Sequence, residues 1–388
     1  MADVYNMDNL VSTLSDFNAT EFRRQLHQYP ELSLNEVNTA ALIAAQLREF
    51  GLFPVTQIGG NGVICTIESG VAGDTTLLRA DFDALPISEK SSIAHCSRHE
   101  GVMHACGHDG HTASLMLVAK HLAITPPQFG KVVLLFQPAE EIGTGAASML
   151  NDNRVATLNV DHVFAYHNLP GYPLNTIIVK PNAFACASTG VIIELEGKTS
   201  HAARPENGIN PTSAMVQLIQ YLQNLPQKYS EAFTLVTVVH ASLGEEAFGT
   251  APGKATVMAT LRSDDGPLFE KMKSDLLETV SEIAVRDNLT CHVEWQESFN
   301  AVMNSPKHCD IVCQQAEKIG LPLVELDEPM RWSEDVSEFL AKWPGALFCI
   351  GSGAEHPQLH NPDYDFPDQL IETASAMFTG IIQQLHHR

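Results

Sequence analysis

The sequence predicts an α/β protein with an open, mostly parallel sheet. A separate α+β domain is expected to be inserted into the chain that forms this sheet. Three observations support this fold class. Short apolar strands alternate with helical segments near both ends of the chain, as they do in parallel sheets. Carboxylates or histidines follow several of these strands, and ligands bind at that edge of an open α/β sheet. The middle of the chain instead has a β-α-β-β-α-β order, which is typical of a split-βαβ sandwich.

The outer parts of the chain contain the elements of the parallel sheet. Apolar residues at helical spacing predict helices within residues 17–50, interrupted at Pro30. The run at 131–136 is apolar on both faces, as a central parallel strand should be. The other expected elements are strands at 62–67, 75–80, 160–166 and 346–350, and helices at 112–121 and from Gly145 onward.

The middle of the chain contains the second set of elements. Near-alternating polarity at 233–239 and 255–261 indicates strands of a sheet with one open face. The remaining elements are strands at 190–196 and 290–295 and helices at 211–225 and 269–286. We therefore expect one discontinuous domain, residues 1–183 and 299–388, and one inserted domain, residues 184–298.

Composition narrows the classes of function. A chain of 388 residues with a formal net charge of −23 disfavours nucleic acid or an anionic membrane as a partner. The N-terminus has neither a basic segment nor an apolar one, so no signal peptide is expected. The sequence contains no apolar run of about 18 residues, so no membrane-spanning helix is expected. Eight cysteines without a regular framework fit a reducing compartment, which predicts a cytoplasmic protein.

The stretch from Met103 to His111, Met-His-Ala-Cys-Gly-His-Asp-Gly-His, is the most informative motif. Cys106 and His108 are two residues apart, so they belong to the turn that enters the next helix and not to one helix face. Three interpretations are open at this point. Cys106 is a buried cysteine beside surface histidines, a nucleophile with a histidine base, or a metal ligand that needs further ligands elsewhere.

Further candidate ligands follow the other predicted strands. Asp83, Glu140, Glu141, His167 and His360 all come at or near strand ends, where they could converge on Cys106 and His108. Adjacent carboxylates allow a division of labour, in which one binds a metal and the other takes a proton from metal-bound water. A metal site explains this whole set, whereas a cysteine nucleophile requires neither the paired glutamates nor the distant histidines.

The inserted domain offers two more candidates. His201 follows the first strand of that domain and could donate a hydrogen bond to an oxyanion. Arg262 ends another of its strands and could bind a substrate carboxylate through two hydrogen bonds. Taken alone, each is more often a surface residue.

Together these motifs resemble a family of dinuclear-metal amidohydrolases. That family includes hippurate hydrolase, indole-3-acetyl-amino-acid hydrolase and N-acyl-amino-acid deacylases, which are relatives of the aminoacylase and carboxypeptidase-G2 group. The resemblance covers nearly the whole chain, and the Cys-Gly-His-Asp-Gly-His and Gln-Pro-Ala-Glu-Glu strings make it specific. The segments that carry it are Arg24–Ser33, Leu78–Ile87, Met103–His111, Phe136–Glu141, His201–Pro205, Ser333–Asp335 and His360–Phe366.

The resemblance implies a role for each candidate residue. Glu140 matches the general base, and Asp83 matches the acid that orients a ligand. His201 matches a lid histidine that reaches the partner subunit's site, and Arg262 matches the residue that binds the α-carboxylate. The positions that match metal ligands are Cys106, as the bridge, with His108, Glu141, His167 and His360.

The same resemblance sets expectations for fold, metals and assembly. The catalytic domain would be of zinc-exopeptidase type, and residues 184–298 would form a ferredoxin-like lid and dimerisation domain of a homodimer. Two divalent ions per subunit are expected, with zinc or manganese first and nickel or cobalt as further options. Three departures from the family pattern, Gly249, Glu206 and Asn210, concern the lid and therefore the substrate; the role of Asp81 is left open.

The sequence thus predicts a metal-dependent hydrolase that cleaves the amide bond of N-acyl amino acids or similar small conjugates. A dipeptidase or carboxypeptidase on the same scaffold is the first alternative, and it would prefer a free α-amine to a capped one. A non-catalytic small-molecule-binding protein is the alternative from another class. The presence of Glu140 together with every candidate ligand argues against that second alternative.

Overall fold

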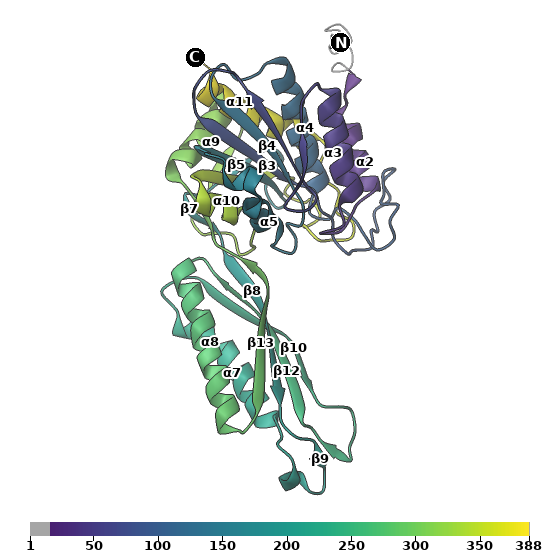
Figure 1. Ribbon diagram of the computed structural model, residues 1–388, viewed down its shortest axis with the longest axis vertical. Helices are drawn as coiled ribbons and strands as arrows, with labels where there is room; N and C mark the ends of the chain where they lie inside the picture. Colours follow the sequence, from purple (N-terminus) through teal and green to yellow (C-terminus); the bar gives the residue numbers. More distant parts are fainter. Residues whose placement is uncertain (1–15, 388) are drawn as a thin grey trace. The chain divides into compact units, whose positions relative to one another are not determined.

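The computed structural model describes residues 16–387, and these divide into two compact units (Figure 1). The first unit comprises the described residues up to Phe184, together with Met303–Glu328 and Asp335 onward. The second unit comprises Ala185–Val302 and the short segment Pro329–Glu334. The predicted α/β fold class is confirmed, because a large mostly parallel sheet forms the first unit and an α+β sandwich forms the second.

The first unit is built on an eight-stranded sheet with the order β1-β2-β4-β3-β5-β16-β6-β15. The four central strands β4, β3, β5 and β16 are parallel to one another, and β2 joins β4 in the antiparallel sense. On the other side, β6 is antiparallel to β16 and parallel to β15. The bounds are β1 Val55–Ile58, β2 Gly62–Glu68, β3 Thr75–Asp81, β4 Lys131–Gln137, β5 His162–Leu169, β6 Ile177–Val179, β15 Leu323–Glu325 and β16 Gly345–Gly351.

Helices pack on this sheet and complete the core of the first unit (Figure 1). Strand β3 is buried along its whole length, as expected for a central strand covered on both faces. No helix within residues 16–387 has the length and apolar character needed to cross a membrane. The helices are α2 Ala19–Gln28, α3 Val37–Glu49, α4 His108–Ile124, α5 Gly145–Asn151, α6 Asn153–Ala156, α9 Pro306–Lys318, α10 Ser337–Lys342 and α11 Gln369–His386.

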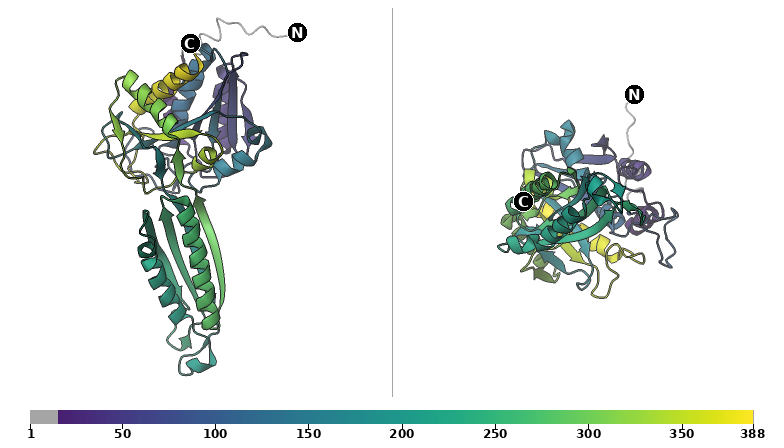
Figure 2. Two further views of the ribbon diagram at one scale, coloured as in Figure 1. Left: turned by 90° about the vertical axis from the view of Figure 1, so that its left-hand side faces the viewer. Right: turned by 90° about the horizontal axis from the view of Figure 1, so that it is seen from below.

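The second unit has the predicted β-α-β-β-α-β order. Its four strands form an antiparallel sheet in the order β10-β12-β8-β13, and helices α7 and α8 pack on one face of it (Figure 2). A two-stranded ribbon, β9 with β11, extends from the same unit. The bounds are β8 Ala187–Glu196, β9 Ser200–His201, α7 Thr212–Lys228, β10 Thr234–Leu243, β11 Thr250–Ala251, β12 Lys254–Ser263, α8 Gly266–Arg286 and β13 Thr290–Phe299.

A pair of buried histidines, His162 at the first residue of β5 and His308 on α9, should make the stability of the first unit depend on pH. His162 Nδ1 lies 3.0 Å from His308 Nε2, and both residues are buried. Burial, followed by the proximity of His162, lowers the pKa of His308 to about 4. An imidazole in the unfolded chain has a pKa of about 6.5, so protons bind the unfolded chain more strongly. Stability is therefore complete above about pH 6.5 and is lost as the pH falls toward 4.

We expect urea unfolding to show a lower free energy of unfolding at pH 5 than at pH 7.5. The variant His308→Gln should show a smaller difference between the two pH values, because it removes one group that must remain neutral. His292, which is exposed on β13, provides the matched control, and His292→Gln should leave the difference unchanged. An unaltered pH dependence in His308→Gln would show that this pair does not contribute.

Candidate metal centre

The candidate site lies at one edge of the large sheet, where three neighbouring parallel strands end. Asp81 ends β3, Gln137 ends β4, and His167 lies near the end of β5. Because parallel strands present their carboxyl ends at the same edge, side chains distant in sequence meet there. The sequence placed His167 just after its strand, whereas β5 continues for two residues beyond it.

A tight turn brings Cys106 and His108 to the same edge. Gly107 has φ of +91° and precedes α4, whose first residue is His108. A Cβ atom at position 107 would lie 2.5 Å from the Asn168 side-chain oxygen. Both the positive φ and this close approach require glycine. The turn therefore directs Cys106 and His108 toward the strand ends.

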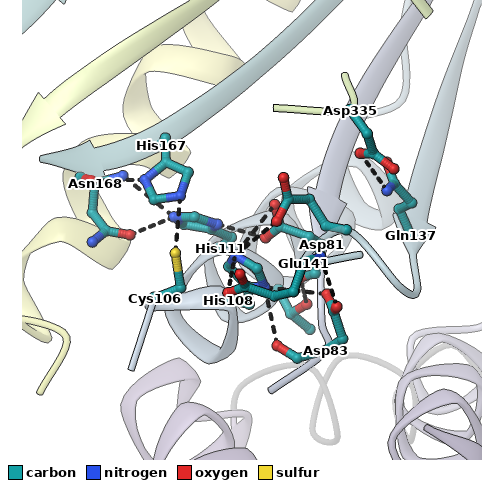
Figure 3. Close-up of polar contacts among 12 residues, drawn as sticks. Asp81, Asp83, Cys106, His108, His111, Gln137, Glu141, His167, Asn168 and Asp335 are labelled. Atoms are coloured by element: carbon teal, nitrogen blue, oxygen red, sulfur yellow. Dashed lines mark hydrogen bonds and ion pairs between the residues drawn. The ribbon is translucent and has the colours of Figure 1, made fainter. Parts of the chain in front are cut away.

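The side chains of the five predicted ligands converge. Figure 3 shows four of them, Cys106, His108, Glu141 and His167. Cys106 Sγ lies 3.5 Å from His167 Nε2. His108 Nε2 lies 3.8 Å from Glu141 Oε1, and His360 Nε2 lies 3.7 Å from Glu141 Oε2. Cys106 belongs both to a group with His108 and His167 and to a group with Glu141 and His360, and within each group the potential ligand atoms lie within 4.8 Å of one another. Two overlapping groups that share the Cys106 sulfur could hold two divalent ions.

Buried polar atoms without partners show that the pocket suits a cation. His108 Nε2 and Glu141 Oε1 are both buried and have no hydrogen-bond partner within residues 16–387. Leaving such groups unsatisfied is costly, so an occupant that satisfies them is expected. A divalent ion placed between a facing imidazole nitrogen and a carboxylate oxygen binds both, and thiolate, imidazole and carboxylate are together a typical zinc donor set.

The electrostatics of the site favour positive charge. Burial alone would lower the pKa of His108, but Asp81 and Asp83 outweigh it and raise the pKa to about 10. Burial raises the pKa of Glu141 to about 8, although His108 opposes the shift. The surroundings thus favour positive charge at His108 and disfavour the negative charge of Glu141 when no cation lies beside it. An ion between His108 and Glu141 would meet both requirements.

Further contacts orient His108 and His167, two of the candidate ligands. His108 Nδ1 lies 3.0 Å from the backbone oxygen of Asp83 and 3.2 Å from its Oδ1. His167 Nδ1 lies 2.7 Å from the backbone oxygen of Asn168. In the neutral form that metal binding requires, these acceptors would place the proton of each ring on Nδ1, which leaves Nε2 free to bind an ion. Asp83 therefore contacts the ring nitrogen of His108 that faces away from Glu141.

Glu140 lies beside the ligand groups. Its Oε2 is 3.9 Å from His108 Nε2, and the residue is 6% exposed. The backbone of Glu141 is fixed by Asp83, because the Glu141 N–H donates to Asp83 Oδ2 at 3.0 Å. The two adjacent carboxylates therefore both reach the same buried space, as a division between metal ligand and proton acceptor requires.

Sequence reasoning missed a buried polar layer beneath the ligands, and it left Asp81 unassigned. Asp81 accepts from Arg79 Nη1 at 2.5 Å, and its other oxygen lies 2.6 Å from His111 Nδ1. Both carboxylate oxygens are thus engaged by neighbours, which favours a supporting role for Asp81 over a role as metal ligand. His111 in turn lies 2.5 Å from Asn168 Oδ1. The only sequence feature that pointed to this layer was the Met103–His111 motif, which ends at His111.

Arg79 connects three segments of this layer. Its Nε donates to Gln137 Oε1 at 2.8 Å, and its Nη2 donates to Asp335 Oδ1 at 3.0 Å. Gln137 Nε2 also donates to Asp335 Oδ1 at 2.7 Å. Because Arg79 and Asp335 are 256 positions apart, no local pattern indicated that they meet.

The other two predicted site residues belong to the second unit. His201 is exposed on β9, and its Nδ1 accepts a hydrogen bond from the backbone N–H of Ala203 at 3.0 Å. Arg262 on β12 donates to the backbone oxygen of Arg331 and to Ser333 Oγ, each at 3.1 Å. Arg262 has no carboxylate partner within the described part of the chain.

Comparison with known proteins places this chain among metal-dependent hydrolases. Residues 77–384 match the model of peptidase family M20/M25/M40. N-acetyl-L-cysteine deacetylase of Bacillus subtilis is 32% identical over 91% of this chain and 84% of that protein. Hippurate hydrolase of Campylobacter jejuni is 31% identical over 96% and 98%. A dinuclear metal-binding M20 peptidase from Bacillus subtilis superimposes with a TM-score of 0.81 at 27% identity, covering 97% of this chain and 99% of that one.

The chain belongs to peptidase family M20/M25/M40. It is a metal-dependent amidohydrolase, as the resemblance implied. This assignment and the convergence of five donors favour the metal interpretation of Cys106 over the nucleophile and over the inert buried cysteine.

Proposed function

We propose that this protein hydrolyses the amide bond of N-acyl amino acids, or of similar small conjugates, to a carboxylic acid and an amino acid. The observation that carries the proposal is the pair of ligand groups sharing Cys106, with Glu140 beside them. The names of two relatives, N-acetyl-L-cysteine deacetylase and hippurate hydrolase, denote N-acyl amino acids as substrates of those proteins. Both relatives cover more than nine-tenths of this chain, which supports the same substrate class here.

In this proposal Cys106, His108, Glu141, His167 and His360 would hold two divalent ions, and Cys106 belongs to both groups of potential ligands. The ions, when bound, polarise the scissile carbonyl and lower the pKa of the attacking water. Glu140 accepts the proton of that water and delivers it to the leaving amine nitrogen. Asp83 keeps His108 oriented through Nδ1. The thiolate favours zinc, whereas the carboxylates and imidazoles also suit manganese, nickel and cobalt.

His201 is proposed to stabilise the oxyanion that forms as water adds to the carbonyl. The N–H of Ala203 donates to Nδ1, so the neutral ring carries its proton on Nε2 and presents a donor. The ring is exposed, so it is accessible to a second molecule. We propose a homodimer in which His201 enters the partner subunit's site. The edge strand β10 could support such a dimer, because its outer backbone groups have no strand partner among residues 16–387.

Arg262 is proposed to bind the carboxylate of the substrate. Burial lowers the pKa of its guanidinium, and the absence of a carboxylate partner within the described residues leaves a cation available for an anionic ligand. We also propose that residues 1–183 and 299–388 form the catalytic domain and residues 184–298 the lid and dimerisation domain. A cytoplasmic location is supported by the absence of any disulfide among the cysteines, all of which lie within the described residues.

The test of the proposal combines metal analysis with activity. Purified protein should hydrolyse at least one member of a panel of N-acetyl, N-benzoyl and longer N-acyl amino acids, and chelation should abolish that activity. Replacing Cys106 with serine should weaken metal binding, measured by elemental analysis after dialysis, because a thiolate is lost from both ligand groups. Cys65, which is buried on β2 and belongs to neither ligand group, is the control, and Cys65→Ser should retain its metals. Full activity in rigorously metal-free protein would contradict the proposal.

A further inference from the structure

The turn that carries Glu140 and Glu141 contains an unusual backbone conformation. Ala139, the residue before Glu140, has φ of +52°. A residue with a Cβ rarely adopts this left-handed conformation, and such conformations persist where surrounding contacts enforce them. Because Ala139 directly precedes Glu140, a change in its backbone angles would redirect the Glu140 side chain. What holds Ala139 therefore matters for the position of the proposed general base.

Both backbone polar groups of Ala139 are engaged. Its N–H donates to Glu36 Oε1 at 2.8 Å. Its carbonyl accepts from the N–H groups of Gly145 at 3.0 Å and Thr144 at 3.3 Å. The carbonyl contacts are local turn contacts, whereas the Glu36 contact spans 103 positions in sequence. Glu36 is thus the distant group that fixes this end of the turn.

Glu36 is well placed to act as a fixed acceptor. The residue is fully buried at the start of α3, and its second oxygen accepts from Asn61 Nδ2 at 3.0 Å. Hydrogen bonds from a backbone N–H to a carboxylate are stronger than those between neutral groups. None of the five proposed metal ligands bonds to Glu36, and neither hydrogen bond of Glu36 is explained by the proposed chemistry. Burial of a carboxylate at this position is costly, so a role for it is expected.

We propose that Glu36 is a positioning residue, which holds Ala139 in its left-handed conformation and thereby directs Glu140 into the metal site. This inference rests on the proposed function, in which Glu140 is the proton acceptor. The inference gives a role to Glu36, which lies three residues after Ser33 and takes no part in the proposed chemistry. Ser33 itself donates to Asp83 Oδ2 at 2.7 Å, so the same segment contacts the supports of both the ligands and the base.

The first test replaces the acceptor. Glu36→Leu removes both oxygens while filling most of the volume, and it should lower kcat by about 5- to 30-fold, the range that corresponds to the usual cost of this conformation. KM and metal content should be unchanged. Glu36→Gln keeps an acceptor and should retain kcat close to that of the wild type. Asn61→Ala removes only the other hydrogen bond of Glu36 and should also leave kcat nearly unchanged.

The second test is a rescue. Glycine adopts positive φ without the penalty that alanine carries, so Ala139→Gly should restore part of the kcat lost in Glu36→Leu. A general loss of packing around Glu36 would not respond to a change at position 139. Should Glu36→Leu fail to fold, Glu36→Asp keeps the charge but withdraws the oxygen, and the same rescue should apply to it. The proposal is overturned by a missing rescue, by an equal loss in Asn61→Ala, or by loss of metal in Glu36→Leu.

A crystal structure of Glu36→Leu separates this inference from the proposed function, since it requires no substrate. Ala139 should move to negative φ, and the Glu140 carboxylate should move away from His108. Retention of positive φ would overturn the inference while leaving the proposed chemistry intact. Conversely, wild-type protein that hydrolyses no N-acyl amino acid would contradict the proposed function, whereas the conformational result would still stand.

Discussion

Replacing Glu140 with glutamine is expected to lower kcat by about 10²- to 10⁴-fold, the usual contribution of a positioned general base. Glutamine has nearly the same shape, so the turn and the neighbouring ligands should be preserved, but its amide cannot accept the proton of the attacking water. Glu140 lies 3.9 Å from His108 Nε2 and is almost fully buried, so it lies beside the ligand groups. Elemental analysis of the variant should show the metal content of the wild type.

The adjacent carboxylate provides the matched control for this experiment. Glu141 contributes one oxygen 3.8 Å from His108 Nε2 and the other 3.7 Å from His360 Nε2, so Glu141→Gln should lose metal as well as activity. If Glu140→Gln loses metal while Glu141→Gln keeps it, the two roles are reversed. The pair of variants thus assigns the roles even if both proteins are inactive.

The fold class could be predicted because its signals are local. The fully buried strand β3 and the apolar run that became β4 appear in sequence as short apolar segments between helices, and β8 to β13 show the order of a split-βαβ sandwich. The last helix, α11, was not predicted, although its buried Leu370, Ile371 and Ala374 follow helical spacing. The antiparallel pairing of β6 with β16 had no comparable signal, because three-residue strands carry little periodicity.

The candidate ligands could be proposed because donor residues at strand ends form a pattern, and the structure brings all five together. The supporting layer could not be proposed in the same way. Arg79, Gln137 and Asp335 are ordinary polar residues until the fold buries them against one another. Glu36 is a further example, since the role proposed for it depends on the φ angle of Ala139, which only the folded turn reveals. Charges buried in pairs are a property of tertiary packing, so composition and spacing do not predict them.

The second large effect is expected from mixing two inactive proteins. Glu140→Gln lacks the proposed base, and His201→Ala lacks the proposed oxyanion donor, so each homodimer alone should be almost inactive. The two are unfolded together in equal amounts and refolded. If His201 acts in the partner subunit's site, each mixed dimer has one site with both groups intact and one site that lacks both. Random pairing makes about half of the dimers mixed, so roughly a quarter of wild-type activity should return.

The exposed position of His201 on the β9–β11 ribbon is what makes this arrangement testable. A site completed within one chain predicts no recovery, because every site would still lack one of the two groups. Mixed dimers must be demonstrated directly, for example by native mass spectrometry of chains that carry different tags. No recovery in proven mixed dimers would exclude the shared site while leaving the metal chemistry intact. Recovery near a quarter would place His201 in the neighbouring subunit's site, since a whole site in a mixed dimer requires Glu140 from one chain and His201 from the other.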